Sequence, residues 1–109
     1  MEITVRDEGD TKVVVLNGKL DTNTSLTAEG EINTLLDAGA GKLLINFEQV
    51  SYISSSGLRL LLATAKKLKG TGGDLKVCSL NEMATEVFEV SGFSSILNVF
   101  SSEQEALGA

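Results

Sequence analysis

The sequence predicts an α/β domain with a small mixed sheet of four to five strands packed with about four helices. Short apolar segments typical of strands alternate with segments whose apolar residues recur every three or four positions, as on one face of a helix. The first two strand-like segments follow each other directly, whereas single helices separate the later ones. We therefore expect an N-terminal antiparallel hairpin, then parallel strands with right-handed crossovers, in one domain over residues 1–109.

The N-terminal segment 2–18 predicts two strands joined by an acidic turn at residues 8–10. Ile3 and Val5 alternate with polar residues, which is typical of a strand with one face in solvent. Residues 13–16 are continuously apolar, so the second strand is expected to be covered on both faces.

The segment 19–39 predicts a helix, because four of its apolar residues share one helical face: Ala28, Ile32, Leu35 and Leu36. Residues 21–25 offer several possible N-caps, and Gly39 is suited to end the helix. Residues 42–47, "KLLINF", predict a buried central strand, followed by a connection through residues 48–52.

The stretch "YISSSGLRLLL", residues 52–62, places three serines and a glycine where a strand meets a helix. The helix is indicated by the i, i+3, i+4, i+7 spacing of Leu58, Leu61, Leu62 and Ala65. Its exposed side is expected to carry Arg59, Lys66 and Lys69. The glycine-rich segment 70–73 ends this helix, and residues 74–80 predict another strand.

The C-terminal part predicts a third helix over 81–93, with Met83, Val87 and Phe88 on one face. Gly92 fits a left-handed residue at the helix end, where Phe88 and Phe93 would make contact. Residues 95–100 predict a short strand or extended segment. A last helix over 101–107 would begin with a capping box formed by Ser102 and Glu105.

Several classes of function are excluded by composition. The chain has no histidine, so a Ser-His-Asp triad, a Cys-His pair and a histidine-ligated zinc site are impossible. The single cysteine, Cys78, cannot form an internal disulfide, and its setting in "LKVCSL" indicates a buried thiol. We expect no enzyme activity, because no nucleophile paired with a general base is visible.

Charge and hydropathy also bear on partners and location. A net charge of −6 with scattered basic residues disfavours nucleic-acid binding. The apolar runs are too short to span a membrane, and the N-terminus does not read as a secretory signal, so we expect a cytoplasmic protein. "GAGK", residues 39–42, departs from a phosphate-binding loop at Leu36 and Leu43 and is interpreted as a turn.

The serine cluster at 54–56 has two interpretations on physical grounds. If Ser54 or Ser55 caps the helix, Ser56 falls in its first turn beside Gly57. The unpaired N–H groups and the positive end of the helix dipole at that place favour an anion. The cluster is therefore either a cap only, or a cap that also presents one hydroxyl for modification.

The chain resembles a STAS domain of the bacterial anti-sigma-factor antagonist family over nearly its whole length. The resemblance rests on "LNGKLDTNTS" after the second strand, "YISSSGLRLLL" at the second helix and "SGFSSILNVFSSEQEAL" at the end. It implies that Ser56 is phosphorylated by an anti-sigma factor that is a serine kinase. It also implies that Asp21 lies near that site and helps to form the binding surface.

The resemblance thus implies a cytoplasmic regulator that binds its kinase while Ser56 is unmodified and so frees a sigma factor. ATP would be bound by the kinase, the protein would need no cofactor of its own, and a serine phosphatase would reset it. Ser55 is the second choice for the modified residue. The expected partner-binding residues are Asp21, Thr22, Asn23, Ser54, Ser55, Ser56, Gly57 and Arg59.

One position departs from the family pattern, because Ser54 stands where these antagonists commonly have an aspartate. Ser54 can cap a helix but brings no carboxylate to the neighbouring hydroxyls. This departure motivates a second hypothesis, a STAS scaffold that holds a larger complex together without being modified. A third hypothesis is direct binding of a nucleotide or small ligand near Asp21 and Ser56.

Overall fold

The computed structural model describes all 109 residues and contains a five-stranded sheet with strand order β1-β2-β3-β4-β5. The β1–β2 pair is antiparallel and the other three pairs are parallel, which confirms the predicted fold class. In chain order the elements are β1 (Glu2–Glu8), β2 (Thr11–Leu20), α1 (Thr22–Asp37), β3 (Lys42–Ile53), α2 (Ser55–Gly70), β4 (Asp74–Cys78), α3 (Glu82–Val90), the 3-10 turn η1 (Phe93–Ser95), β5 (Asn98–Phe100) and α4 (Glu103–Gly108).

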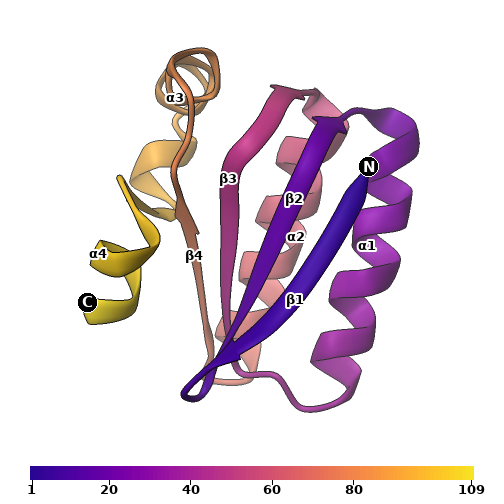
Figure 1. Ribbon diagram of the computed structural model, residues 1–109, viewed down its shortest axis with the longest axis vertical. Coiled ribbons are helices and arrows are strands. Elements are labelled where there is room, and N and C mark those ends of the chain that lie inside the picture. Colours follow the sequence, from indigo (N-terminus) through magenta and orange to yellow (C-terminus); the bar gives the residue numbers. More distant parts are fainter.

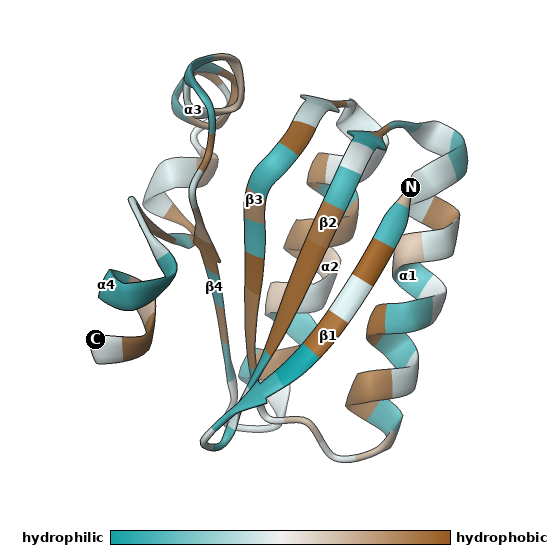
Figure 2. Cartoon of the chain, in the orientation of Figure 1, coloured by the Kyte–Doolittle hydropathy of each residue, from teal (hydrophilic) through white to brown (hydrophobic).

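The helices are distributed unequally over the two faces of the sheet (Figure 1). α1 and α2 cover one face, where they enclose the main hydrophobic core with β2 and β3. α4 lies on the opposite face, over a smaller apolar cluster of Val13, Leu44, Cys78 and Ala106. Figure 2 shows why the central strands need cover on both sides, since apolar residues run along most of β2 and the first half of β3. None of the helices has the length and apolar character that a membrane span requires.

The apolar faces of the two long helices agree with the predicted spacing. In α1, Ala28 and Ile32 are fully buried, and Leu35 and Leu36 are half-buried at the edge of the core. In α2, Leu61 is fully buried, whereas Leu58, Leu62 and Ala65 are half-buried. The buried face of α2 is wider than predicted and includes Leu60, Thr64 and Leu68, because α2 packs against both α1 and the sheet.

Three details of the sequence interpretation are wrong. Residues 48–52 do not form a connection, because β3 continues through them to Ile53. Met83 does not lie on the core face of α3, since its side chain is 43% exposed and the buried residues are Ala84 and Phe88. The capping box of α4 is incomplete: Ser102 accepts from the backbone N–H of Glu105, but the Glu105 carboxylate accepts from Ser101 instead.

Other predicted ends are confirmed. Gly39 and Gly92 follow α1 and α3 with positive φ angles of 96° and 81°. The predicted contact between Phe88 and Phe93 is present as an edge-to-face pair with ring centroids 6.2 Å apart. Cys78 is buried, and this burial raises the pKa of its thiol.

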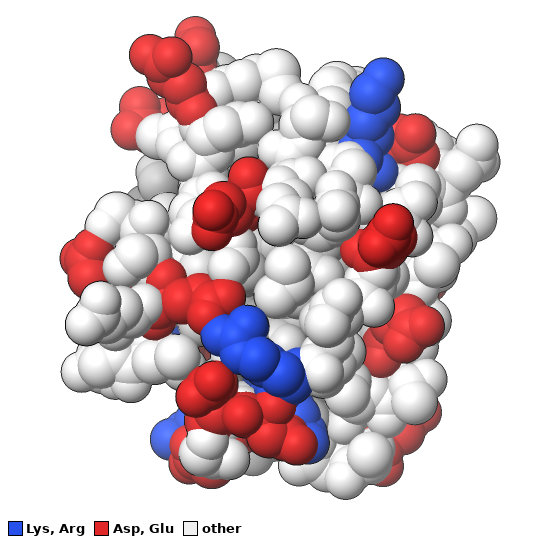
Figure 3. Space-filling view, in the orientation of Figure 1, with Lys and Arg blue, Asp and Glu red and all other residues white.

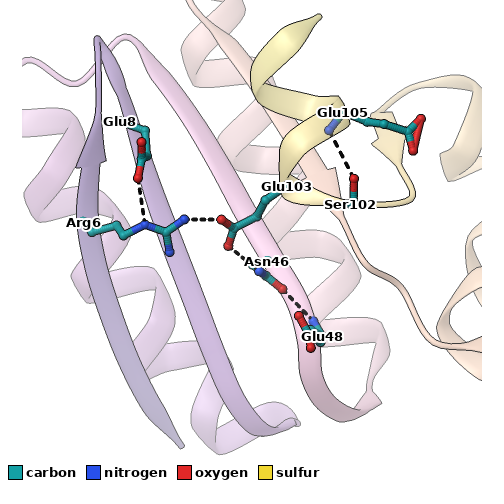
Figure 4. Close-up of polar contacts among 7 residues, drawn as sticks. All are labelled: Arg6, Glu8, Asn46, Glu48, Ser102, Glu103 and Glu105. Carbon is teal, nitrogen blue, oxygen red and sulfur yellow. Dashed lines mark hydrogen bonds and ion pairs between the residues drawn. The ribbon is translucent and has the colours of Figure 1, made fainter.

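A polar cluster of Arg6, Asn46 and Glu103 holds α4 on the face of the sheet opposite α1 and α2 (Figure 4). The Glu103 carboxylate accepts hydrogen bonds from Arg6 on β1 and from the buried amide of Asn46 on β3. At the other end of α4, Lys76 donates to the carbonyl oxygens of Ala106 and Ala109. Figure 3 shows opposite charges gathered over the lower ends of β1 and β2, where Arg6 also pairs with Glu8.

The turn between α2 and β4 predicts a sharp substitution effect at Gly73. A Cβ at Gly73 would lie 2.1 Å from the carbonyl oxygen of Gly41, which accepts from the Asp74 backbone N–H. Because backbone would have to move, we expect Gly73→Ala to lower the free energy of unfolding by about 1–3 kcal/mol. Gly70→Ala is the matched control, since nothing lies near its Cβ position and its stability should be unchanged or higher. Urea unfolding curves of both variants test this, and equal midpoints would contradict it.

The Glu103 cluster predicts a pH-dependent contribution to stability. The hydrogen bonds from Arg6 and then Asn46 hold the pKa of Glu103 below its ordinary value of 4.5. A lowered folded-state pKa stabilises the fold above the unfolded-state pKa, and that stability is lost as the pH falls through the folded value. We expect Glu103→Gln to cost about 0.5–1.5 kcal/mol at pH 7, a range that allows for solvent screening of Arg6. The difference in free energy of unfolding between Glu103→Gln and the wild type should shrink below about pH 4.5. Denaturant titrations measure it, and a difference that stays constant down to about pH 3 would contradict a stabilising role for the ionised Glu103 carboxylate.

Candidate functional site

Two irregularities in the β2–β3 pairing bring the ends of these strands to the same place. The register shifts between Val15 and Asn17, and again between Gly18 and Lys19, with an extra residue on β3 each time. At the first shift, the buried side chain of Asn46 accepts from the backbone N–H of Glu48 at 2.8 Å. The backbone N–H of Glu48 at the first bulge therefore keeps a hydrogen-bond partner, and the two strands end side by side at Leu20 and Ile53.

The start of α2 is attached directly to the end of β2. The backbone N–H of Ser54 donates to the carbonyl oxygen of Leu20 at 2.9 Å. Gly57 is buried in the first turn, where a Cβ would lie 2.9 Å from Leu20 side-chain atoms and 3.0 Å from Ile53. The glycine after the serine cluster is therefore required by close packing of α2 on the strand ends.

Both helices that begin at this edge have side-chain caps. Asp21 accepts from the backbone N–H of Thr24 at 3.0 Å, and Thr24 Oγ1 accepts from the backbone N–H of Asp21 at 2.8 Å, which completes a capping box. These hydrogen bonds lower the pKa of Asp21, first through the Thr24 backbone. Ser54 caps α2 by accepting from the Gly57 backbone N–H at 3.3 Å, so the cap survives without an aspartate at this position.

The Ser56 hydroxyl lies between the two helix starts. Its Oγ is 3.4 Å from Thr22 Oγ1 at the first residue of α1. The guanidinium of Arg59, one turn later in α2, donates to the same Oγ at 3.3 Å. Ser56 is half-buried, whereas Thr22 and Arg59 are exposed, so the hydroxyl is at the surface and in contact with both helices.

The structure brings the sequence-predicted site residues together at the starts of α1 and α2. Thr22 contacts Ser56 directly, and the Asp21 side chain, one residue earlier, is engaged in the α1 cap. Asn23 and Ser55 are exposed and form no side-chain hydrogen bonds within the chain. Seven of the eight predicted residues lie within the first turns of α1 and α2 or immediately before them, and Arg59 follows in the second turn of α2.

Two apolar residues near this edge were not predicted as part of the site. Leu26 is 69% exposed and follows Thr22 by four residues, so it lies on the same side of α1. Tyr52 is 44% exposed on the last residues of β3. The sequence holds a signal for Leu26, since this leucine falls outside the i, i+4, i+7 spacing of the apolar face of α1. No comparable signal marks Tyr52.

Comparisons with known proteins agree with this architecture. A family model described as STAS domain matches residues 2–106. The chain is 33% identical over 109 residues to the putative anti-sigma factor antagonist BtrV of Bordetella bronchiseptica, covering 100% of this chain and 94% of BtrV. It is 28% identical over 86 residues to the anti-sigma-B factor antagonist of Staphylococcus aureus, covering 79% of this chain and 80% of the relative.

Solved structures show the same fold. A putative anti-sigma factor antagonist from Thermotoga maritima superposes with a TM-score of 0.94 at 19% identity, over 97% of this chain and 92% of the other. The Bacillus cell fate determinant SpoIIAA in its phosphorylated form gives a TM-score of 0.76 at 26% identity, and the match covers 98% of this chain and 97% of SpoIIAA. Unphosphorylated SpoIIAA gives a TM-score of 0.77 at 24% identity, and the match covers 98% of this chain and 96% of SpoIIAA. With a family match over almost every residue and a relative above 30% identity, this chain belongs to the STAS domain family.

Proposed function

We propose that this protein is an anti-sigma-factor antagonist that binds an anti-sigma factor serine kinase while Ser56 is unmodified, and so frees a sigma factor. The observation that carries the proposal is the position of Ser56 Oγ, at the surface between the starts of α1 and α2. The family relationship and the names of the relatives support the same function.

The proposed reaction is transfer of a phosphoryl group from ATP held by the kinase. The Ser56 oxygen attacks the γ-phosphorus of ATP, the bond between that phosphorus and the β,γ-bridging oxygen breaks, and ADP leaves. The hydroxyl proton is released to a base of the kinase or to water. A serine phosphatase would hydrolyse the phosphoserine and reset the protein. The chain itself acts as binding partner and substrate.

The consequence of phosphorylation follows from charge. A phosphoryl group adds about −1.5 to −2 charges at pH 7. At the N-terminus of α2 this charge is favoured by about 0.3–1 kcal/mol, so the fold tolerates it. Taking this dianion out of water in a covered interface costs several kcal/mol, which pairing with one cation does not fully offset, and about 1.4 kcal/mol corresponds to a tenfold loss of affinity. Phosphorylation would therefore weaken binding by a hundredfold or more without unfolding the protein.

The surface around Ser56 has features suited to a protein partner. Leu26, exposed one turn after Thr22 on α1, supplies apolar area that a partner can bury. Thr22, Asn23 and Ser55 supply exposed polar groups around the hydroxyl.

The first test identifies the modified residue. On incubation with its cognate kinase and ATP, we expect one phosphoryl group on Ser56, located by mass spectrometry of proteolytic fragments. Ser56→Ala should abolish incorporation, while Ser55→Ala should leave it intact, because only Ser56 is held between the helices. Phosphate on Ser55 alone would identify Ser55 as the modified residue. If neither serine carried phosphate, the proposed phosphorylation switch would be wrong.

The second test separates the switch from the scaffold hypothesis, which is motivated by Ser54 at the position of the usual aspartate. Ser56→Asp places a carboxylate in the proposed interface, and we expect affinity for the kinase to fall at least tenfold. Ser94→Asp adds the same charge at an exposed serine of η1 and serves as the control. Calorimetric titration measures both. Nearly unchanged affinity of Ser56→Asp would favour an unmodified scaffold.

A further inference from the structure

We infer that Arg59 pairs with the phosphoryl group on Ser56 and stabilises the phosphorylated state. The inference rests on the function proposed above and gives Arg59 a role beyond contact with a partner. The carrying observation is that Nη2 of Arg59 donates to Ser56 Oγ at 3.3 Å, the oxygen that would bear the phosphorus. The two residues are three positions apart on α2, so their side chains are neighbours on the helix surface.

The Arg59 guanidinium is free to take on this role. The ion pairs of the chain use Arg6, Lys12 and Lys42, and Arg59 takes part in none of them. A guanidinium has five N–H donors in a planar fork, and only one of them is used by the Ser56 hydroxyl. The remaining donors suit the two-pronged pairing that arginine makes with phosphate.

The other charges around Ser56 leave Arg59 as the cation in direct contact. Asp21 is a carboxylate whose pKa is lowered by its hydrogen bonds to Thr24, so it is negative at neutral pH and repels a phosphate. Lys19 at the end of β2 acts on Asp21 through space and forms no ion pair with it. Lys66 follows Arg59 by seven residues on α2, which places it about 10 Å further along the helix.

The serine at position 54 also favours the phosphorylated form of Ser56. An aspartate two residues before the phosphoserine would place a second negative charge at the start of α2. Ser54 keeps the cap through its hydroxyl without adding this charge. An uncharged cap and a contacting guanidinium both favour the phosphorylated form, so the departure from the family pattern and Arg59 form one electrostatic arrangement.

The test uses phosphoserine installed at position 56 during translation, so that no kinase is needed. The second pKa of the phosphate, about 6 in phosphoserine, is measured by a ³¹P NMR titration. We expect Arg59→Gln to raise this pKa by about 0.5 or more, because the dianion loses its paired cation. Arg59→Lys should give an intermediate value, since an ammonium keeps the charge but not the planar fork.

Lys66→Gln is the matched control, because it removes an exposed cation from the same helix and should leave the phosphate pKa unchanged. Thermal unfolding of each variant verifies that it is folded. An unchanged phosphate pKa in Arg59→Gln, or an equal rise in Lys66→Gln, would overturn the inference. Failure of a kinase to modify Ser56 bears on the proposed function alone, because the installed phosphoserine reports the Arg59 contact either way.

Discussion

The position of Ser56 depends on the hydrogen bond between the Ser54 N–H and the Leu20 carbonyl oxygen. This hydrogen bond and the packing of Gly57 on Leu20 join the start of α2 to the end of β2, and α1 begins two residues after Leu20. Because both helices leave the sheet from this junction, Thr22 and Ser56 meet although they are 34 residues apart in the sequence. The close approach requires Gly57, since any side chain there would press on Leu20 and Ile53.

The junction in turn depends on the irregular register of β2 and β3. Two extra residues on β3 bring Ile53 opposite Leu20, and without them the strand ends would be offset. Asn46 connects this region with the far face of the sheet. The side-chain oxygen of Asn46 accepts from the backbone N–H of Glu48 at the bulge, and its side-chain amide donates to Glu103 on α4. One buried side chain thus supports the bulge on one side and anchors a helix on the other (Figure 4).

Much of the fold could be predicted from periodicity because burial of apolar residues dominates its stability. The spacing of Ala28 and Ile32 identifies α1, and the run at residues 13–16 identifies a strand covered on both faces. The continuation of β3 through residues 48–52 could not be predicted this way. Bulges interrupt the alternation of a strand, so the pattern there resembles that of a loop. The pairing of Glu105 with Ser101 was equally hidden, because two adjacent serines offer the carboxylate alternative partners.

In the candidate site, too, some features follow from the local sequence and others only from the tertiary structure. The serine cap of α2 and the capping role of Asp21 follow from residue types near a helix start, which are local signals. The contact of Thr22 with Ser56 depends on how two helices are placed by the sheet, and no local pattern contains that information. Leu26 lies between these cases, since its exposure follows from its phase on α1 but its relevance follows from the position of Thr22.

The rigidity of this junction determines the kind of switch that it can support. Ser56 is held by a capped helix, a buried glycine contact and a backbone bond to the sheet, and none of these involves its hydroxyl. Modification of the hydroxyl therefore changes charge without releasing any of them. The proposed phosphorylation of Ser56 would therefore act on the partner through electrostatics and desolvation, and it would require no rearrangement of the sheet or helices.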